Sequence, residues 1–542
     1  MLNTLIISPY NLFIFLPELW LSTTVLILLV YVVLPKTRTI GQWAQIQDTD
    51  KLSVGILGIT LILILNQMNW CLNGSLDSVN GALSSYNGLI KVDAMICFIK
   101  FICILGGLLV IWISKEYYAQ EKLATTGHNI LILLALLGIT LLVSSNDLLA
   151  LYLAMELQSL SFYTLATLKR DDESSTEAGL KYFILGALSS GIFLFGVSLI
   201  YGLTGLTNFD SLNLFIFGIG LDSDSSIYSI TGLLIGIIFI GIAFLFKLAA
   251  APFHMWVPDV YQGSPTSITA LFAIVPKLAI FGVLIRLYLD TFLGLMIQWQ
   301  PLIIFCSIAS MVIGSFGALN QSLIKRLLAY SAISHIGYVL IAFASGTHTS
   351  LQALLIYMTI YMIMSIQSFS VLLSLRKKLN GKSINYLIEL VSLSRTQPVL
   401  GATFAISLLS LAGIPPLAGF FSKWLVFSSA IQSHFYLLAI IGVLTSVLAS
   451  VYYLRIIINI FARFSVALTT TNSGVSHQIS RLNPAGGIFA LNVLFDTLNP
   501  YILIDRPKSL ILGWTTFLIL FILFFPTPLL LICHEVALNL YL

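Results

Sequence analysis

The sequence predicts an all-α, polytopic membrane protein with about fourteen transmembrane helices. Of its 542 residues, 58% are hydrophobic and only 9% are charged, whereas an ordinary soluble domain has about 25% charged residues. The apolar residues form long windows of about 20 residues, which is the length of a helix that crosses a bilayer. A transmembrane β-barrel would instead show alternating segments of about 10 residues.

The expected spans are separated by short loops, and one long polar stretch precedes the last of them. They centre on residues 11–34, 52–72, 92–114, 128–145, 147–168, 178–204, 228–250, 266–289, 301–320, 327–346, 350–375, 398–430, 434–462 and 509–532. The stretch Ser465–Pro507 is rich in polar residues and includes a short apolar patch. We therefore expect a polar loop at 463–508.

Basic residues gather in the loops of one membrane face. Eighteen lysines and arginines fall in alternate loops, against only Lys91 and Arg286 in the others. Loops rich in Lys and Arg remain on the cytoplasmic or matrix side. Both termini are therefore expected on the opposite side, which agrees with an even number of spans.

Two apolar segments combine a lysine with prolines. Phe239–Pro265 contains Lys247, followed by Pro252, and Leu408–Trp424 contains Lys423 after Pro415 and Pro416. Proline removes a helix hydrogen bond, and irregular backbone survives within a membrane only where protein or a water-filled cavity satisfies it. Two interrupted segments in corresponding halves indicate an internally repeated transporter.

Intramembrane ionisable residues are candidate members of a proton pathway. A lysine removed from water can exchange a proton near neutral pH, and a nearby carboxylate changes how firmly that proton is held. Glu156, in the middle of a span, is the natural partner of Lys247. We expect a relay of Glu156, Lys247, Lys277 and Lys423, because such residues are functional by default. The alternative is a static ion pair that joins two helices.

Three further residues could join this relay, namely Lys181, His254 and His335. Imidazole titrates near neutral pH, but a lone histidine is often a hydrogen-bonded core residue, and Lys181 lies near the end of its span. Asp93 and Lys100 are seven residues apart and would share a helix face, which favours a structural pair. The five cysteines form no CxxC pair, and the chain shows neither a Walker A loop nor a dinucleotide fingerprint. We therefore expect no metal site and no bound cofactor.

Three long motifs resemble the antiporter-like membrane subunits of respiratory complex I, in particular chain 2, the N-type subunit. They are ELQSLSFYTLATLKRDDESSTEAGLKYFILGALSSGIFLFGVSLIYGLTG at 156–205, FKLAAAPFHMWVPDVYQGSPT at 246–266 and LAGIPPLAGFFSKW at 411–424. The resemblance implies N-terminal helices 1–3 in 1–127 and a first repeat of helices 4–8 in 128–290. A second, inverted repeat of helices 9–13 would occupy 301–462, and helix 14 would lie in 509–542, with helices 7 and 12 broken.

The resemblance also implies a function. It assigns Glu156, Lys247, Lys277 and Lys423 to proton transfer and matches Lys181 to the lysine of the family's KYF motif. The chain would translocate protons within NADH:ubiquinone oxidoreductase, beside other membrane-arm subunits and membrane lipids and without nucleic acid. NADH, FMN, iron–sulfur clusters and ubiquinone would be bound by partner subunits.

Two other functions share this fold and charge pattern. One is a subunit of a sodium/proton antiporter or a membrane-bound hydrogenase, and the other is a scaffold subunit that moves no protons itself. The N-terminus shows no transit peptide or cleaved signal. We expect the mitochondrial inner membrane, with both termini on the intermembrane-space side. A bacterial cytoplasmic membrane is the alternative.

Overall fold

The computed structural model describes residues 13–33, 42–72, 83–121, 126–219, 227–376, 383–391, 393–462 and 505–541. Nearly all of the expected polar loop Ser465–Pro507 lies outside these ranges. Within them, thirteen helices are long and apolar enough to cross a membrane, which confirms the all-α membrane fold. The figure of fourteen spans stays a prediction, as does the division into two repeats.

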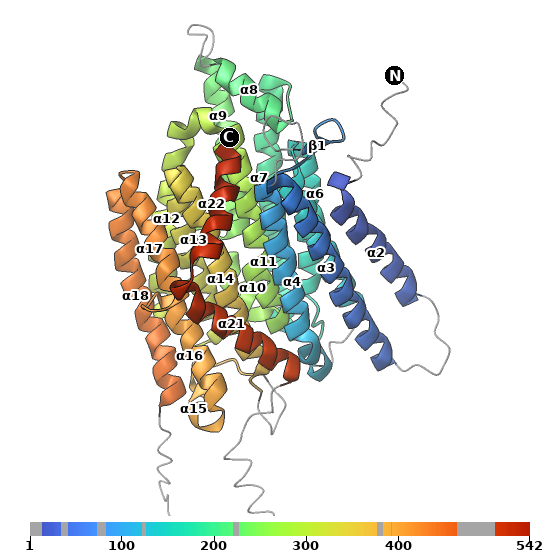
Figure 1. Cartoon of the computed structure of the whole chain (residues 1–542), viewed down its shortest axis with the longest axis vertical. Helices are drawn as coiled ribbons and strands as arrows, with labels where there is room; N and C mark the ends of the chain where they lie inside the picture. Colours follow the sequence, from blue (N-terminus) through green and yellow to red (C-terminus); the bar gives the residue numbers. More distant parts are fainter. Residues whose placement is uncertain are drawn as a thin grey trace, which may run out of the picture.

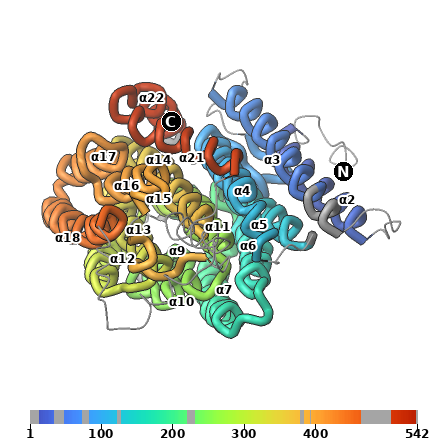
Figure 2. Tube along the Cα trace, turned by 90° about the horizontal axis from the view of Figure 1, so that it is seen from below, coloured from blue at the N-terminus to red at the C-terminus, as the bar shows by residue number. Residues whose placement is uncertain are grey.

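The described residues of the N-terminal part form three helices and a small hairpin. The helices are α2 (Leu16–Val33), α3 (Gln42–Leu72) and α4 (Ala94–Gln120). Strands β1 (Leu83–Ser85) and β2 (Ile90–Val92) pair antiparallel between α3 and α4. Figure 2 shows α2 and α3 at one edge of the bundle, with α4 further inside.

Residues 126–219 and 227–284 form seven α-helices. They are α5 (Thr126–Ser144), α6 (Leu148–Ala166), α7 (Glu173–Thr204), α8 (Phe209–Ile219), α9 (Ile227–Leu248), α10 (Trp256–Gly263) and α11 (Thr266–Leu284). A π-helical turn, η2 (Ile285–Thr291), and a short 3₁₀ turn, η3 (Leu293–Leu295), follow α11. The short α8 caps one end of the bundle, near β1 (Figure 1).

A second group of helices lies beside the first. It contains α12 (Met296–Leu319), α13 (Ile324–Ser345), α14 (His348–Ser374), the 3₁₀ turn η4 (Leu387–Leu390), α15 (Leu393–Thr396), α16 (Pro398–Ala412), α17 (Ala418–Gln432) and α18 (Tyr436–Phe461). In Figure 2, α17 and α18 lie at the edge opposite α2 and α3.

The C-terminal helix differs from the expectation of a single span over 509–532. Helix α21 (Arg506–Phe524) ends before Pro526, and a separate helix α22 (Thr527–Tyr541) follows. Pro526 has no N–H group with which to continue the hydrogen-bond ladder, which explains the break. Figure 1 shows α21 crossing the bundle obliquely and α22 running along it.

The centre of the bundle is formed by α11, α13 and α14. Along the most apolar 18 residues of each of these helices, at least 94% is buried. Along the same length of α2, α7 and α21, only 33% is buried. A helix that is apolar on every side is buried, so any charged side chain that it carries is surrounded by protein. Lys277 lies on α11 and His335 on α13.

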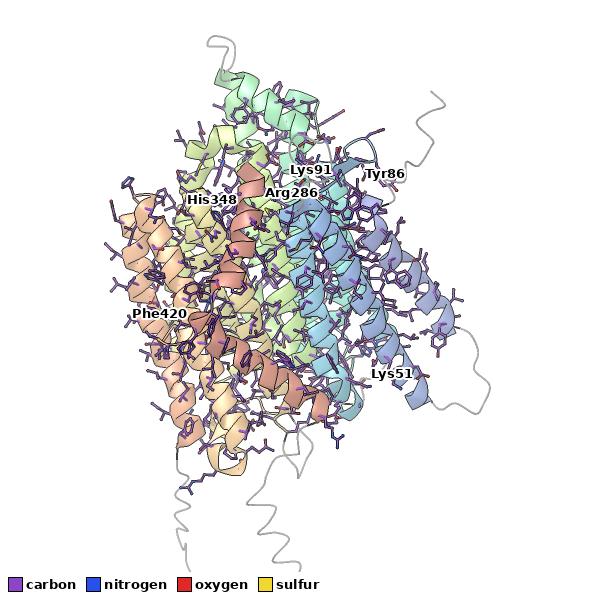
Figure 3. All side chains as sticks on the ribbon, in the orientation of Figure 1. Lys51, Tyr86, Lys91, Arg286, His348 and Phe420 are labelled. Atoms are coloured by element: carbon purple, nitrogen blue, oxygen red, sulfur yellow. The ribbon has the colours of Figure 1, made fainter. Side chains whose placement is uncertain are left out.

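The labelled charges agree with the predicted separation of the loops. Lys91 and Arg286 lie near one end of the bundle, and Lys51 lies toward the other (Figure 3). At the first end, Arg286 donates hydrogen bonds to the carbonyls of Val143 and Ser145 at 3.1 and 2.7 Å. A third bond, of 2.8 Å, reaches Asn146 Oδ1. Arg286 therefore fastens the end of α11 to the connection between α5 and α6.

Candidate functional site: a row of buried charges

Two transmembrane segments are discontinuous, as the prolines predict. Helix α9 ends at Leu248, and α10 begins only at Trp256. Helix α16 ends at Ala412, and α17 begins at Ala418, so the expected span at 398–430 consists of two half-helices. The broken helices 7 and 12 are thus confirmed.

Lys423 lies after its break, in α17, but its ammonium group returns to the end of the preceding half-helix. Its Nζ donates to the carbonyls of Leu411 at 3.1 Å and Ala412 at 2.8 Å. These are the last carbonyls of α16, where the helix dipole favours a cation. Gly413 leaves room for this approach, because a Cβ there would lie 2.8 Å from the Lys423 Cδ.

Lys247 lies before its break, in the last turn of α9. Both lysines therefore belong to the C-terminal end of a first half-helix, although they lie on opposite sides of their breaks in the sequence. Among the described residues, Lys247 donates its one side-chain hydrogen bond to the Tyr163 hydroxyl, at 3.4 Å. The same ammonium lies 5.9 Å from the centre of the Tyr163 ring.

Glu156 is close to Lys247 but does not form an ion pair with it. No contact of 4.0 Å or less joins the two charged groups in the described structure. The Glu156 charge nevertheless acts on Lys247 electrostatically. Ser159, one turn along α6, donates to Glu156 Oε2 at 3.3 Å. This geometry does not support a tight static ion pair between α6 and α9.

Lys277 lies in the buried centre, next to Pro276 on α11. Its side chain is 3% exposed, and its Nζ has no hydrogen-bond partner among the described residues. The ring of Tyr261 lies 5.6 Å from this nitrogen. A buried ammonium without a polar partner is costly, and such groups in membranes mark ion and proton pathways.

His335 lies on α13, which packs against α11, the helix of Lys277, and against α17, the helix of Lys423. Both Lys277 and Lys423 act on the imidazole electrostatically. Its Nδ1 lies 2.7 Å from the Tyr357 hydroxyl, and its Nε2 lies 3.3 Å from the Tyr453 hydroxyl. His335 is thus a fully buried polar group with a partner on each ring nitrogen.

The helices that carry these groups are neighbours. Helix α11 packs against α6, α9 and α13, and α13 packs against α17. Figure 2 shows α6 and α17 toward opposite sides of the bundle, with α11 and α13 between them. We call these five residues the buried row: Lys277, His335 and Lys423 are buried, and Glu156 and Lys247 are half-buried. The row crosses the bundle from α6 to α17.

Two of the expected candidates lie outside the buried row. Lys181 is 42% exposed and forms ion pairs with Glu177 at 2.7 Å and Asp259 at 2.8 Å. Arg326 approaches the other Asp259 oxygen at 3.5 Å. His254 lies half-buried between α9 and α10, and no hydrogen bond between its side chain and Lys247 is present in the described structure.

The expected pair of Asp93 and Lys100 is wrong. Lys100 instead pairs with Glu18 on α2, and the two side chains are 0% and 1% exposed. Asp93 Oδ1 is buried without a partner in the described part of the chain. Helical spacing places two residues on one face but does not identify what the neighbouring helix presents there, and here α2 presents a glutamate.

Sequence reasoning missed the tyrosines that surround these groups. Tyr163 contacts Lys247, Tyr261 lies beside Lys277, and the Tyr338 ring lies 5.1 Å from Lys423 Nζ. Tyr357 and Tyr453 hold His335. A buried tyrosine hydroxyl needs a hydrogen-bond partner. Tyrosines in the middle of apolar spans can be read from the sequence and would have pointed to these contacts.

The comparisons with known proteins agree with this arrangement. Residues 145–449, which include the whole buried row, match the family model described as "NADH:quinone oxidoreductase/Mrp antiporter, TM". The chain belongs to this family.

Curated relatives within the family extend the match along the chain. The chain is 41% identical over 529 residues to NADH-ubiquinone oxidoreductase chain 2 of Marchantia polymorpha, covering 97% of this chain and 98% of that protein. It is 42% identical over 442 residues to NADH-quinone oxidoreductase subunit N of Beijerinckia indica, covering 82% and 87%. The predicted resemblance to chain 2 and the N-type subunit is confirmed.

Solved structures of the same fold include a chain of respiratory complex I from Thermus thermophilus. It superimposes with a TM-score of 0.71 at 27% identity and covers 95% of this chain and 98% of that chain. A chain of the Mrp complex from a Dietzia species gives a TM-score of 0.78 at 21% identity, covering 98% of each chain. The second likeness shows a shared fold alone.

Proposed function

We propose that this chain is a proton-translocating membrane-arm subunit of NADH:quinone oxidoreductase and that its protons pass along the buried row. The observation that carries the proposal is Lys277, a fully buried lysine without a hydrogen-bond partner among the described residues. It lies on the helix that packs against both α9, with Lys247, and α13, with His335. A structural role would leave such an ammonium paired.

The geometry supports a stepwise mechanism. Energy released by redox chemistry in other subunits shifts the influence of Glu156 on Lys247, and Lys247 then takes up or releases a proton. The proton continues to Lys277, and His335 lies where it can connect Lys277 with Lys423. Because Glu156 and Lys247 are near each other but are not locked in an ion pair, their interaction can be altered at modest cost.

The assignment places the chain within a larger complex. Its partners are other membrane-arm subunits and membrane lipids, while NADH, FMN, the iron–sulfur clusters and ubiquinone belong to partner subunits. The match to land-plant chain 2 covers 97–98% of this chain, against 82% for subunit N of B. indica. This coverage supports the mitochondrial inner membrane. The excess of Lys and Arg in alternate loops supports termini on the intermembrane-space side.

The test is proton pumping by intact complexes that carry Lys247→Met or Glu156→Gln. We expect each variant to assemble and to lose most of its NADH-driven pumping. The matched control is Glu177→Gln, since Glu177 is an exposed glutamate on α7. Normal pumping by both variants in an assembled complex would show that protons do not pass by Glu156 and Lys247, and it would favour the scaffold alternative.

The sodium/proton antiporter and hydrogenase alternatives share the fold. The Mrp likeness is 21% identical, whereas the curated relatives named chain 2 or subunit N are 38–43% identical. Isolation of the native complex with flavin and iron–sulfur subunits would support our proposal. Recovery with antiporter subunits alone would favour the Mrp type.

A further inference from the structure

Tyr163 contacts Lys247 at the α6 end of the buried row and shares its helix with Glu156. Its hydroxyl is the hydrogen-bond partner of Lys247, and its ring faces the same ammonium. Glu156 lies seven residues earlier on α6, which is two helical turns along the same face. An ion pair between Glu156 and Lys247 is absent from the described residues, so a proton cannot pass between them by direct contact in this structure.

Ser159 fills the turn between Glu156 and Tyr163. Its hydroxyl lies 3.1 Å from the Glu156 carbonyl oxygen and 3.3 Å from Glu156 Oε2, and Tyr163 follows one helical turn later on the same helix. The spacing of three and then four residues keeps all three side chains on one face of α6. Ser159 faces Oε2, which is therefore the oxygen that would accept the proton, while Oε1 is buried without a partner in the described structure.

The neighbouring helices fix the position of the Tyr163 hydroxyl. A Cβ on Gly186 of α7 would lie 1.9 Å from this oxygen, so only glycine leaves room for it there. The Tyr182 ring meets the Tyr163 ring edge-on at 4.9 Å and stacks on Trp256 of α10 at 4.8 Å. The tyrosine is therefore held by α7, which itself contacts α10, the half-helix that follows the break after Lys247.

We propose that Ser159 and Tyr163 form a hydroxyl bridge that carries a proton between Lys247 and Glu156. The Lys247 ammonium gives a proton to the Tyr163 oxygen while the Tyr163 hydroxyl gives its proton to Ser159, and Ser159 gives its own to the Glu156 carboxylate. One N–H bond and two O–H bonds break, and three O–H bonds form. The products are a neutral amine and a carboxylic acid, and neither hydroxyl retains a charge.

The hydroxyl bridge gives roles to residues other than Glu156 and Lys247. Tyr163 and Ser159 touch the moving proton, and Gly186 is a positioning residue that acts through Tyr163. The inference rests on the proposed function, since it specifies how Glu156 and Lys247 exchange their proton. It also explains why the two charges can communicate without direct contact.

The test is Tyr163→Phe in the intact complex, measured as protons pumped per NADH oxidised and as the rate of NADH:quinone turnover. The phenyl ring keeps the packing against Tyr182 and removes only the bridging oxygen. We expect pumping to fall by about tenfold or more, within the range of a lost acid–base group, in a complex that assembles normally. Tyr182→Phe is the matched control and should pump normally.

Ser159→Ala is an independent test that changes no aromatic ring. It should reduce pumping, whereas Ser161→Ala should not, because the Ser161 hydroxyl only bonds the Leu157 carbonyl at 2.9 Å. Tyr163→Phe should add no further loss in a Lys247→Met background, which a purely structural role would not predict. Additive losses would therefore overturn the bridge.

Lys247→Met, measured in the same series, separates the two proposals. If Lys247→Met stops pumping while Tyr163→Phe and Ser159→Ala pump at the normal rate, the bridge is wrong and the relay stands. If Lys247→Met itself pumps normally, the proposed function fails and the bridge fails with it.

Discussion

Replacing Gly413 with alanine should displace Lys423 from the end of α16. Gly413 has a φ of +84°, in the left-handed region, and it is the C-cap of α16. An alanine Cβ would lie 2.8 Å from Lys423 Cδ and 3.1 Å from its Nζ. The lysine must therefore move away from the two carbonyls that it bonds.

Two costs add at this position. A left-handed backbone costs a non-glycine residue about 1–2 kcal/mol. Loss of one of the two charge-assisted bonds, to Leu411 or Ala412, costs about 1.5–3 kcal/mol. The sum is about 2.5–5 kcal/mol, and about 1.4 kcal/mol in a barrier already corresponds to a tenfold change in rate.

Two other glycines separate these costs. Gly205 has a φ of +68° but open space around its Cβ position, and Gly513, in α21, has open space and an ordinary φ. Thermal unfolding and NADH-driven pumping of the intact complex would be measured for all three alanine variants. We expect Gly205→Ala to lose some stability only, Gly513→Ala to change little, and Gly413→Ala to lose both stability and pumping. If Gly413→Ala lost stability but pumped normally, as expected for Gly205→Ala, the hydrogen bonds of Lys423 to the end of α16 would not be needed for pumping.

Two further predictions concern buried charges that hold the bundle together. Lys100→Met or Glu18→Gln alone leaves one member of a fully buried pair and should destabilise the protein by about 3–5 kcal/mol, seen as a lower melting temperature. The double variant should recover most of this loss, and unchanged melting in both single variants would disprove the pairing. Arg286→Met removes all three hydrogen bonds of its guanidinium and should reduce the amount of assembled complex on native gels, while each assembled complex still pumps normally. Normal assembly would show that the Arg286 network is dispensable.

The amino-acid sequence is sufficient to predict the all-α membrane fold and to include every member of the buried row among its candidates, although Lys181 and His254, also candidates, lie outside the row. Membrane spans can be recognised in the sequence because a helix that crosses a bilayer must be long and apolar, with its backbone groups hydrogen-bonded within the segment. A lysine in such a span has few possible explanations, so Lys247, Lys277 and Lys423 are identifiable from the residue pattern alone. The prolines at 252, 415 and 416 likewise predict both breaks, because proline cannot continue the hydrogen-bond ladder.

Pairings between helices cannot be predicted in the same way. Lys100 shares a helix face with Asp93, yet it bonds to Glu18, and the choice depends on how α2 packs against α4. The same limit applies to Tyr163, whose contact with Lys247 requires α6 and α9 to approach, and to Gly186, which makes room for it. Periodicity gives the face that a side chain shares, whereas its partner depends on tertiary packing.

The central claim is that protons cross this subunit through its buried lysines, and Lys277→Met tests it most directly. The substitution removes the charge at the buried centre and keeps an unbranched side chain of similar length. The measurement is the number of protons pumped per NADH oxidised by the assembled complex, with the half-exposed surface Lys169→Met as the control. The account predicts a severe loss of pumping for Lys277→Met and none for the control. An assembled Lys277→Met complex that pumps at the normal ratio would contradict it.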